Sequence, residues 1–177
     1  MKQALFVILF LLSLIAIEKI YCGSPFRSAY IISSPYHSTI GKGGERRNNI
    51  HEGIDLYPVD DDWIIFPVLP GIISKVGIDD IYGKYVIIEH ANGLFTKYAH
   101  GATIYSKHKE GEHVSTIDYI MLMGDTGYSG GAHVHIEAYR IINGKKVNEN
   151  PLKYINRSLY EKITYMENHY EIKGLVN

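Results

Sequence analysis

The sequence contains little that could fix a fold covalently or bind nucleic acid. Cys22 is the only cysteine among 177 residues, which excludes an intramolecular disulfide. The 18 basic and 19 acidic residues nearly cancel, and no basic run exceeds the pairs Arg46-Arg47 and Lys145-Lys146, so no nucleic-acid partner is expected. A hydrophobic share of 46 % is enough for one core, and we expect a single globular domain that is a monomer.

The one long apolar run lies near the N-terminus, from Ala4 to Ile17. It is short for a bilayer span and fits the hydrophobic region of a signal peptide. We therefore predict a signal peptide or an N-terminal membrane anchor over residues 1–22, and an exported protein of the periplasm, the cell envelope or the extracellular space. No small-x-small cleavage site follows the run, so a retained membrane tether stays open. A lipid on Cys22 is the less favoured alternative, because Tyr21 before it is bulky.

Short β-branched and aromatic runs separated by glycine dominate the middle of the chain. Strands are expected over 71–76, 85–89, 94–100, 120–123 and 133–141. Asn92-Gly93 and Asn143-Gly144 lie between such runs and indicate type I′ hairpin turns, which need positive φ at both central residues. The pattern predicts a mainly β domain, built on an antiparallel sheet, over residues 25–155.

Helical periodicity is confined to the C-terminus. Apolar residues recur there every three or four positions, at Ile155, Leu159, Ile163, Met166 and Tyr170. Ser158 and Glu161 have the spacing of a capping box. One terminal helix is therefore predicted, within a tail of residues 156–177.

Two groups of histidines and acids suggest a metal site. His133 and His135 alternate with one residue on a predicted strand, so both side chains point to the same face, about 6.6 Å apart along the chain. His51 and Asp55 would be about 13 Å apart in an extended chain, so the backbone must bend between them, and Gly53 permits the bend. A helix is disfavoured here, because Gly53 and β-branched Ile54 are poor helix formers.

These residue types suit zinc. Two imidazoles and one carboxylate form a three-ligand set that leaves the fourth position open for water, as a catalytic zinc site requires. The spacing alone does not decide between His133 and His135 as the second imidazole. The site is not the His-Glu-x-x-His helix of other zinc peptidases, because Asp55 stands at the fifth position.

Four stretches of the chain resemble, in order, the motifs of lysostaphin-type (LytM-like) zinc endopeptidases: HEGID at 51–55, YGKYVIIEH at 82–90, KYAH at 97–100 and GDTGYSGGAHVHIE at 124–137. The resemblance runs from about residue 33 to residue 152. It implies a barrel-sandwich hybrid fold, also called the duplicated hybrid motif, and hydrolysis of peptide cross-links or stem peptides of bacterial peptidoglycan.

Carried over by position, the resemblance makes His51, Asp55 and His135 the ligands of one Zn²⁺ per chain. It makes His100 and His133 the two unligated histidines of the active site, and leaves open which of them is the base. The glycine-rich segment 124–131 leads into a strand and lacks the Lys-Ser or Lys-Thr ending of a phosphate-binding loop, so we expect it to be a flexible wall of the substrate groove. Within it Asp125 stands where most members of that family have serine.

The remaining five of the nine histidines are predicted to be solvated surface residues: His37, His90, His108, His113 and His169. Two other functions fit the sequence less well. A non-catalytic binding relative usually lacks some of the ligands, and all five site residues are present here. A biotinyl or lipoyl carrier domain needs a modifiable lysine in a Met-Lys context at the tip of a hairpin, and neither Asn-Gly turn has one.

Overall fold

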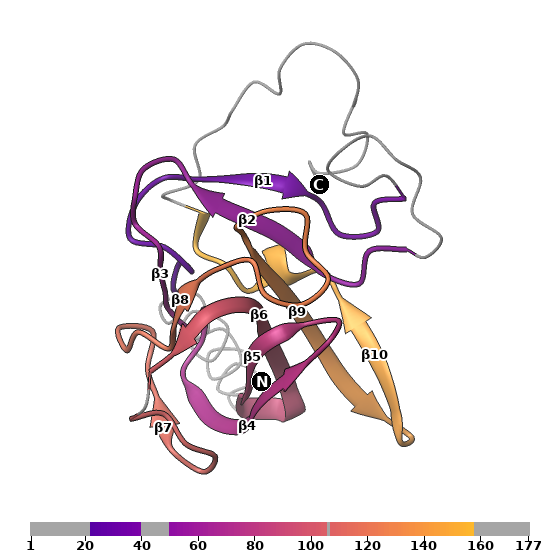
Figure 1. Ribbon diagram of the computed structural model, residues 1–177. Helices are drawn as coiled ribbons and strands as arrows, with labels where there is room; N and C mark the ends of the chain where they lie inside the picture. Colours follow the sequence, from indigo (N-terminus) through magenta and orange to yellow (C-terminus); the bar gives the residue numbers. More distant parts are fainter. Residues whose placement is uncertain (1–21, 40–49, 106, 158–177) are drawn as a thin grey trace, which may run out of the picture.

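The computed structural model describes residues 22–39, 50–105 and 107–157 (Figure 1). This part of the chain forms ten strands and two 3₁₀ turns. The strands are β1 (Tyr30–Ser34), β2 (Ile54–Pro58), β3 (Ile64–Ile65), β4 (Gly71–Asp79), β5 (Gly83–Glu89), β6 (Leu94–Ile104), β7 (His113–Val114), β8 (Met121–Met123), β9 (Val134–Ile142) and β10 (Lys145–Glu149). The 3₁₀ turns are η1 (Ala91–Gly93) and η2 (Pro151–Lys153).

The strands form one antiparallel sheet in the order β1-β2-β9-β6-β5-β4-β7. β10 pairs with the second half of β9, while β8 pairs with both β3 and β6. β9 is therefore central: β2 and then β10 pair with one of its edges, and β6 pairs with the other. The mainly β, antiparallel fold expected from the sequence is confirmed.

Both predicted Asn-Gly turns are present. Asn92 and Gly93 have φ of 60° and 68°, and they connect β5 to β6. Asn143 and Gly144 have φ of 51° and 73°, and they connect β9 to β10. The left-handed backbone that these turns require explains why asparagine and glycine stand there.

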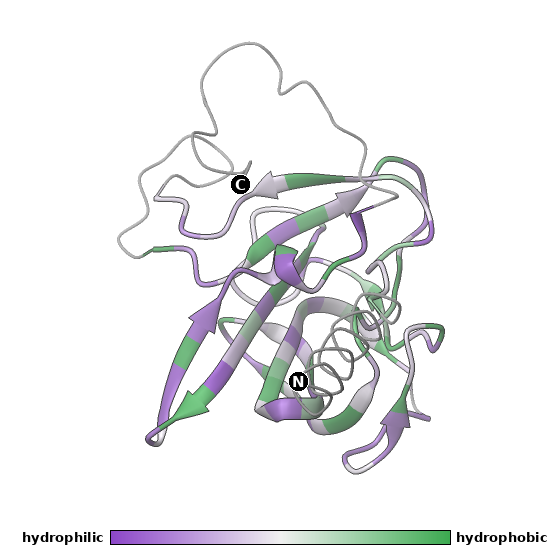
Figure 2. Ribbon diagram, turned by 180° about the vertical axis from the view of Figure 1, so that it is seen from behind, coloured by the Kyte–Doolittle hydropathy of each residue, from purple (hydrophilic) through white to green (hydrophobic). Residues whose placement is uncertain are grey.

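The core lies against one face of the central strands. Side chains alternate across a strand, so every second residue of β2 and of the first half of β9 faces the core. Hydrophobic and hydrophilic residues alternate along these strands (Figure 2). Ile54, Leu56, Val134 and Ile136 are all fully buried there. The residues between them point to the opposite face of the sheet, where the candidate site lies.

The predicted leader and the predicted terminal helix fall almost entirely on residues 1–21 and 158–177, outside the described part of the chain. Both therefore stay predictions. Among the residues that are described, no helix is long and apolar enough to cross a membrane.

Candidate active site

His51, Asp55 and His135 converge on one point. Asp55 on β2 is paired directly with His135 on β9, and His51 lies just before β2. Asp55 Oδ1 is 2.8 Å from His135 Nδ1 and 3.1 Å from His51 Nε2, and the two ring nitrogens are 3.1 Å apart. All three residues are buried, with 6 to 8 % of their surface exposed. Cross-strand pairing thus brings together residues that are about 80 positions apart.

The predicted bend between His51 and Asp55 is present at Glu52 and Gly53, directly before β2 begins. Glycine is required there for a reason beyond flexibility. A Cβ atom at residue 53 would lie 2.4 Å from the carbonyl oxygen of Ile136 and 2.7 Å from Cε1 of His135. Gly53 therefore lets the first motif pack directly against the ring of His135.

Hydrogen bonds fix which nitrogen of each ring faces the cluster. His51 Nδ1 donates to the carbonyl oxygen of Pro35 at 3.0 Å, so its Nε2 carries the lone pair. The ring of His135 lies between two carboxylates, with Nε2 3.4 Å from Glu137 Oε1 and Nδ1 2.8 Å from Asp55 Oδ1. A metal ion that takes the lone pair of Nδ1 would leave the ring hydrogen on Nε2, where Glu137 would accept it. His51 Nε2 and His135 Nδ1 are therefore the nitrogens that face the shared place beside Asp55.

The three donors fit a divalent metal ion. Ligands at about 2.0–2.1 Å from a tetrahedral zinc are about 3.3 Å from one another, and the three distances of 2.8 to 3.1 Å come within a few tenths of that value. A divalent cation between these atoms would bind a lone pair of each ring and would be balanced in part by the negative charge of Asp55. Within the described residues, this is the only group of three or more such side chains that could hold a metal ion.

Electrostatics keep Asp55 ionised. Burial alone would raise the pKa of this carboxyl group, but its contacts with the rings of His135 and His51 outweigh burial and hold its pKa far below the usual range. The pKa of Glu137 behaves in the same way, because His135 and Lys97 outweigh the effect of burial. Both carboxyl groups are therefore negative at neutral pH.

His100 reaches the site through an irregularity in β6. Simple alternation would place it on the core face with Tyr98. A bulge interrupts the pairing of β5 with β6, because Lys84 pairs with Gly101 while Val86 already pairs with Tyr98. His100 lies inside this bulge with a φ of 64°, an uncommon value for a residue other than glycine. The bulge turns its ring toward His133, 4.7 Å away between ring centres.

His100 and His133 both present Nε2 to the cluster. His100 Nδ1 donates to the carbonyl oxygen of Thr126 at 2.8 Å, and His133 Nδ1 donates to that of Gly131 at 2.7 Å. His133 Nε2 lies 3.6 Å from Asp55 Oδ1. Burial lowers the pKa of His100 to about 4, opposed in part by its bond to Thr126, so this ring is neutral at pH 7. All five residues expected at the site are thus brought together.

The glycine-rich segment 124–131 forms one wall of the site and is tied to β5 and β6. Thr126 Oγ1 donates to the carbonyl of Gly101 and accepts from the backbone nitrogen of Lys84. Asp125 Oδ1 accepts from the backbone nitrogen of Gly131 at 2.9 Å, which closes the loop on itself. The segment expected to be flexible is therefore held in place by the hydrogen bonds of Thr126 and by the bond between Asp125 and Gly131.

Sequence reasoning assigned no role to a charged cluster behind His135. Glu137 has only 1 % of its surface exposed and contacts the ammonium groups of Lys97 and Lys146 at 3.3 and 2.8 Å. Tyr82 donates to the same carboxylate at 2.8 Å. Alternation along β9, which places Glu137 on the face of His135, was the available signal.

The prediction for the other histidines is partly wrong. His37 and His113 are exposed as expected, and His169 lies outside the described residues. His90 and His108 are buried, because each finds hydrogen-bond partners within the fold. His108 Nε2 donates to the carbonyl of Tyr119 at 2.6 Å.

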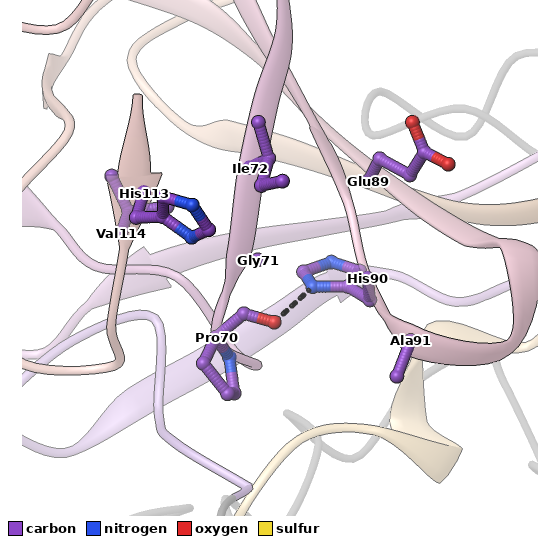
Figure 3. A pocket seen from close by; sticks show the side chains of 8 residues that line it. All are labelled: Pro70, Gly71, Ile72, Glu89, His90, Ala91, His113 and Val114. Atoms are coloured by element: carbon purple, nitrogen blue, oxygen red, sulfur yellow. Dashed lines mark hydrogen bonds between the residues drawn. The ribbon is translucent and has the colours of Figure 1, made fainter. Parts of the chain in front are cut away.

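His90 belongs to a buried polar chain. Its Nδ1 donates to the carbonyl of Pro70 at 2.9 Å, the dashed line in Figure 3, and its Nε2 is 2.7 Å from Thr96 Oγ1. Thr96 in turn contacts the hydroxyl of Tyr98 at 3.2 Å. His90 also lines a hollow of about 440 Å³ at the edge of β4 and β7, which none of the five site residues lines.

Comparison with known proteins relates this chain to a family of peptidases. The family model described as "Peptidase family M23" matches residues 49–149. A protein of Buchnera aphidicola named "Uncharacterized metalloprotease" is 32 % identical over 151 residues, which is 82 % of this chain and 39 % of that protein. The "Peptidoglycan DD-endopeptidase ShyA" of Vibrio cholerae is 41 % identical over 78 residues, 44 % of this chain and 17 % of that protein.

A solved structure shows the same fold. The crystal structure of a zinc-containing peptidase from Vibrio cholerae matches with a TM-score of 0.58 and 26 % identity, over 72 % of this chain and 39 % of that one. This chain therefore spans well under half the length of each of these three proteins.

Proposed function

Because this chain belongs to peptidase family M23, we propose that its β domain is a zinc-dependent endopeptidase that hydrolyses peptide cross-links or stem peptides of bacterial peptidoglycan. One observation carries the proposal. Two imidazoles and one carboxylate, from separate parts of the sequence, meet within 3.1 Å of one another beside two further imidazoles.

His51, Asp55 and His135 would hold one zinc ion per chain. The carboxylate brings one negative charge and the two rings are neutral donors, so the loaded site keeps a net charge near +1. Zinc in such a site acts as a Lewis acid that lowers the pKa of water to about 7 and polarises a carbonyl group. The carbonyl of Pro35 and the carboxylate of Glu137 would accept the hydrogen on the other nitrogen of each ring, so that His51 Nε2 and His135 Nδ1 would face the ion.

His100 and His133 would carry the proton through hydrolysis. Breaking an amide bond needs a base for the proton of the attacking water and a donor for the leaving nitrogen. The low pKa of His100 supports it as the proton acceptor, since its Nε2 is unprotonated at neutral pH. His133, whose Nε2 lies 3.6 Å from Asp55 Oδ1 at the edge of the three donors, would then be the proton donor to the leaving nitrogen.

The substrate class rests on two supports. A relative in Vibrio cholerae bears the name of a peptidoglycan DD-endopeptidase. The apolar segment from Ala4 to Ile17 has the features of an export signal or anchor, and export would bring the enzyme to the wall. We propose a peptidase domain of residues 25–155, flanked by this leader and by a helical tail, acting as a monomer in the envelope or outside the cell.

Digestion of purified sacculi tests the proposal. Zinc-loaded protein should release peptide fragments whose masses correspond to cuts in cross-links or stems, and the His135→Ala variant should release none. His113→Ala is the matched control, since this exposed histidine lies outside the site, and it should be as active as the unmodified protein. Equal release by the His135→Ala variant, or no release by zinc-loaded wild type, would contradict the proposal.

A further inference from the structure

The carboxylate of Glu137 touches the face of His135 that points away from the metal site. Oε1 receives the Nε2 hydrogen of His135 at 3.4 Å and the hydroxyl hydrogen of Tyr82 at 2.8 Å. Oε2 receives hydrogen bonds or charge contacts from Lys146 at 2.8 Å and Lys97 at 3.3 Å. Every side of this buried carboxylate is therefore contacted by a donor.

These contacts fix the direction of the carboxylate. Lys97 lies with its ammonium group 3.3 Å from the ring centre of Tyr82, so the two donors also hold each other in place. Lys146 is bound in addition by Glu52, next to the ligand His51, at 2.9 Å. With Oε2 bound by two ammonium groups, Oε1 is the oxygen left to face His135.

We propose that Glu137 is a positioning residue for the metal site: it accepts the Nε2 hydrogen of His135 and so directs the Nδ1 lone pair of that ring toward the point shared by His51 and Asp55. This inference rests on the proposed function, since it assumes that His135 is a ligand. A histidine ligand usually donates its other nitrogen to a carboxylate or carbonyl, which sets both its tautomer and its orientation. His51 uses the carbonyl of Pro35 for this purpose, and His135 uses Glu137.

Glu137→Ala and Glu137→Gln both remove the acceptor that faces His135. In the alanine variant the dissociation constant for Zn²⁺, measured by competition with a chelator, should rise about 10- to 100-fold. Glutamine keeps the size of the side chain, but the two ammonium groups would hold its one oxygen at the position of Oε2, so its NH₂ group would face His135 and Glu137→Gln should also weaken zinc binding. The glutamine variant also keeps the test open if alanine at this buried position prevents folding.

Glu149→Gln is the matched control. Glu149 likewise binds a basic group and a tyrosine hydroxyl, those of Arg140 at 2.8 Å and Tyr154 at 2.7 Å, but no histidine. Its variant should bind Zn²⁺ as the wild type does. If Glu137→Ala and Glu137→Gln also kept the wild-type zinc affinity while losing only thermal stability, Glu137 would be structural and the inference would be overturned.

A second readout needs no variant. In ¹⁵N NMR spectra of the zinc-loaded protein, His135 should carry its hydrogen on Nε2, and this hydrogen should exchange slowly with water. A hydrogen on Nδ1 of His135 would overturn the inference. Failure of the wild type to bind Zn²⁺ at all would instead contradict the proposed function, so the two failures are distinguishable.

Discussion

The two faces of β9 differ in chemistry although their residues alternate along one strand. Val134 and Ile136 are fully buried in the apolar core. His135 and Glu137 are also buried, with 8 % and 1 % of their surface exposed, but their neighbours are imidazoles, carboxylates and ammonium groups. Burial is therefore nearly the same on both faces, and the kind of partner distinguishes them.

Adjacent residues of one strand therefore serve different purposes: those on the core face stabilise the fold, and those on the other face form the candidate site. Apolar burial on the core face stabilises the fold, at roughly 25 cal/mol per Å². Polar groups on the site face offset the cost of their own burial by binding one another, and contribute less net stability. Changes on the two faces should therefore move different measurements.

Loss of a metal donor should have the largest effect. Replacing His135 or Asp55 with alanine removes one of three converging donors, so zinc and hydrolytic activity should be lost together. Zinc content by mass spectrometry and peptide release from sacculi check this, with circular dichroism showing that the sheet is retained. If the His135→Ala variant still purified with one zinc per chain, His135 would not be a metal donor and the proposed difference between the two faces of β9 would be contradicted.

Replacing His100 or His133, which are not among the three proposed zinc ligands, should lower the activity without changing the zinc content. His100→Ala and His133→Ala remove proton transfer, which typically contributes 10²- to 10⁴-fold to rate, while the three donors stay in place. We expect activity to fall by about that factor with zinc content unchanged. Should either variant lose as much zinc as His135→Ala does, the division of roles would be wrong.

A core change next to the site should show the reverse pattern. Ile136→Ala removes buried methyl groups beside His135 and should lower the free energy of unfolding by about 2–5 kcal/mol. Activity per folded molecule should stay near that of the wild type, because the site face is untouched. Urea unfolding together with kinetics measured well below the unfolding transition tests this. A large loss of activity without destabilisation would contradict it.

The smallest expected effect is the contribution of His90 to the pH dependence of the free energy of unfolding. Burial lowers the pKa of His90 below 6.5, so under more acidic conditions the unfolded chain binds a proton that the folded chain does not. This contribution to stability is complete above about pH 6.5 and is lost as the pH falls toward the folded-state pKa, by at most about 1.4 kcal/mol per pH unit.

His90→Gln should flatten this part of the pH dependence. The free energy of unfolding, measured by urea at several pH values between 7 and 5, should fall less steeply in the variant than in the wild type. His113→Gln, an exposed change at the same sheet edge, is the control and should keep the wild-type slope. Identical slopes for wild type and His90→Gln would show that His90 is protonated as easily in the fold as outside it.

Local pattern was enough to predict much of the fold and part of the site. The Asn-Gly turns are set by the φ values of two adjacent residues, so they are visible in the sequence. The shared direction of His133 and His135 follows from strand alternation, and the bend at Gly53 follows from the reach of two short side chains. Each of these inferences uses residues within five positions of one another.

Features that depend on pairing between distant strands were not predictable in this way. Alternation alone gives the wrong face for His100, because the bulge that turns it is defined only by the register of β5 against β6. Lys97 meets Glu137 because β6 pairs with β9 in that register. The burial of His90 likewise depends on Pro70 and Thr96, which the fold brings to it.

The central claim is that His51, Asp55 and His135 bind one ion together. Anomalous diffraction at the zinc absorption edge from crystals of the zinc-loaded protein tests it most directly. We expect one strong peak per chain, about 2.0–2.2 Å from His51 Nε2, Asp55 Oδ1 and His135 Nδ1. A zinc peak elsewhere in the molecule, or no peak near these three atoms, would contradict the account.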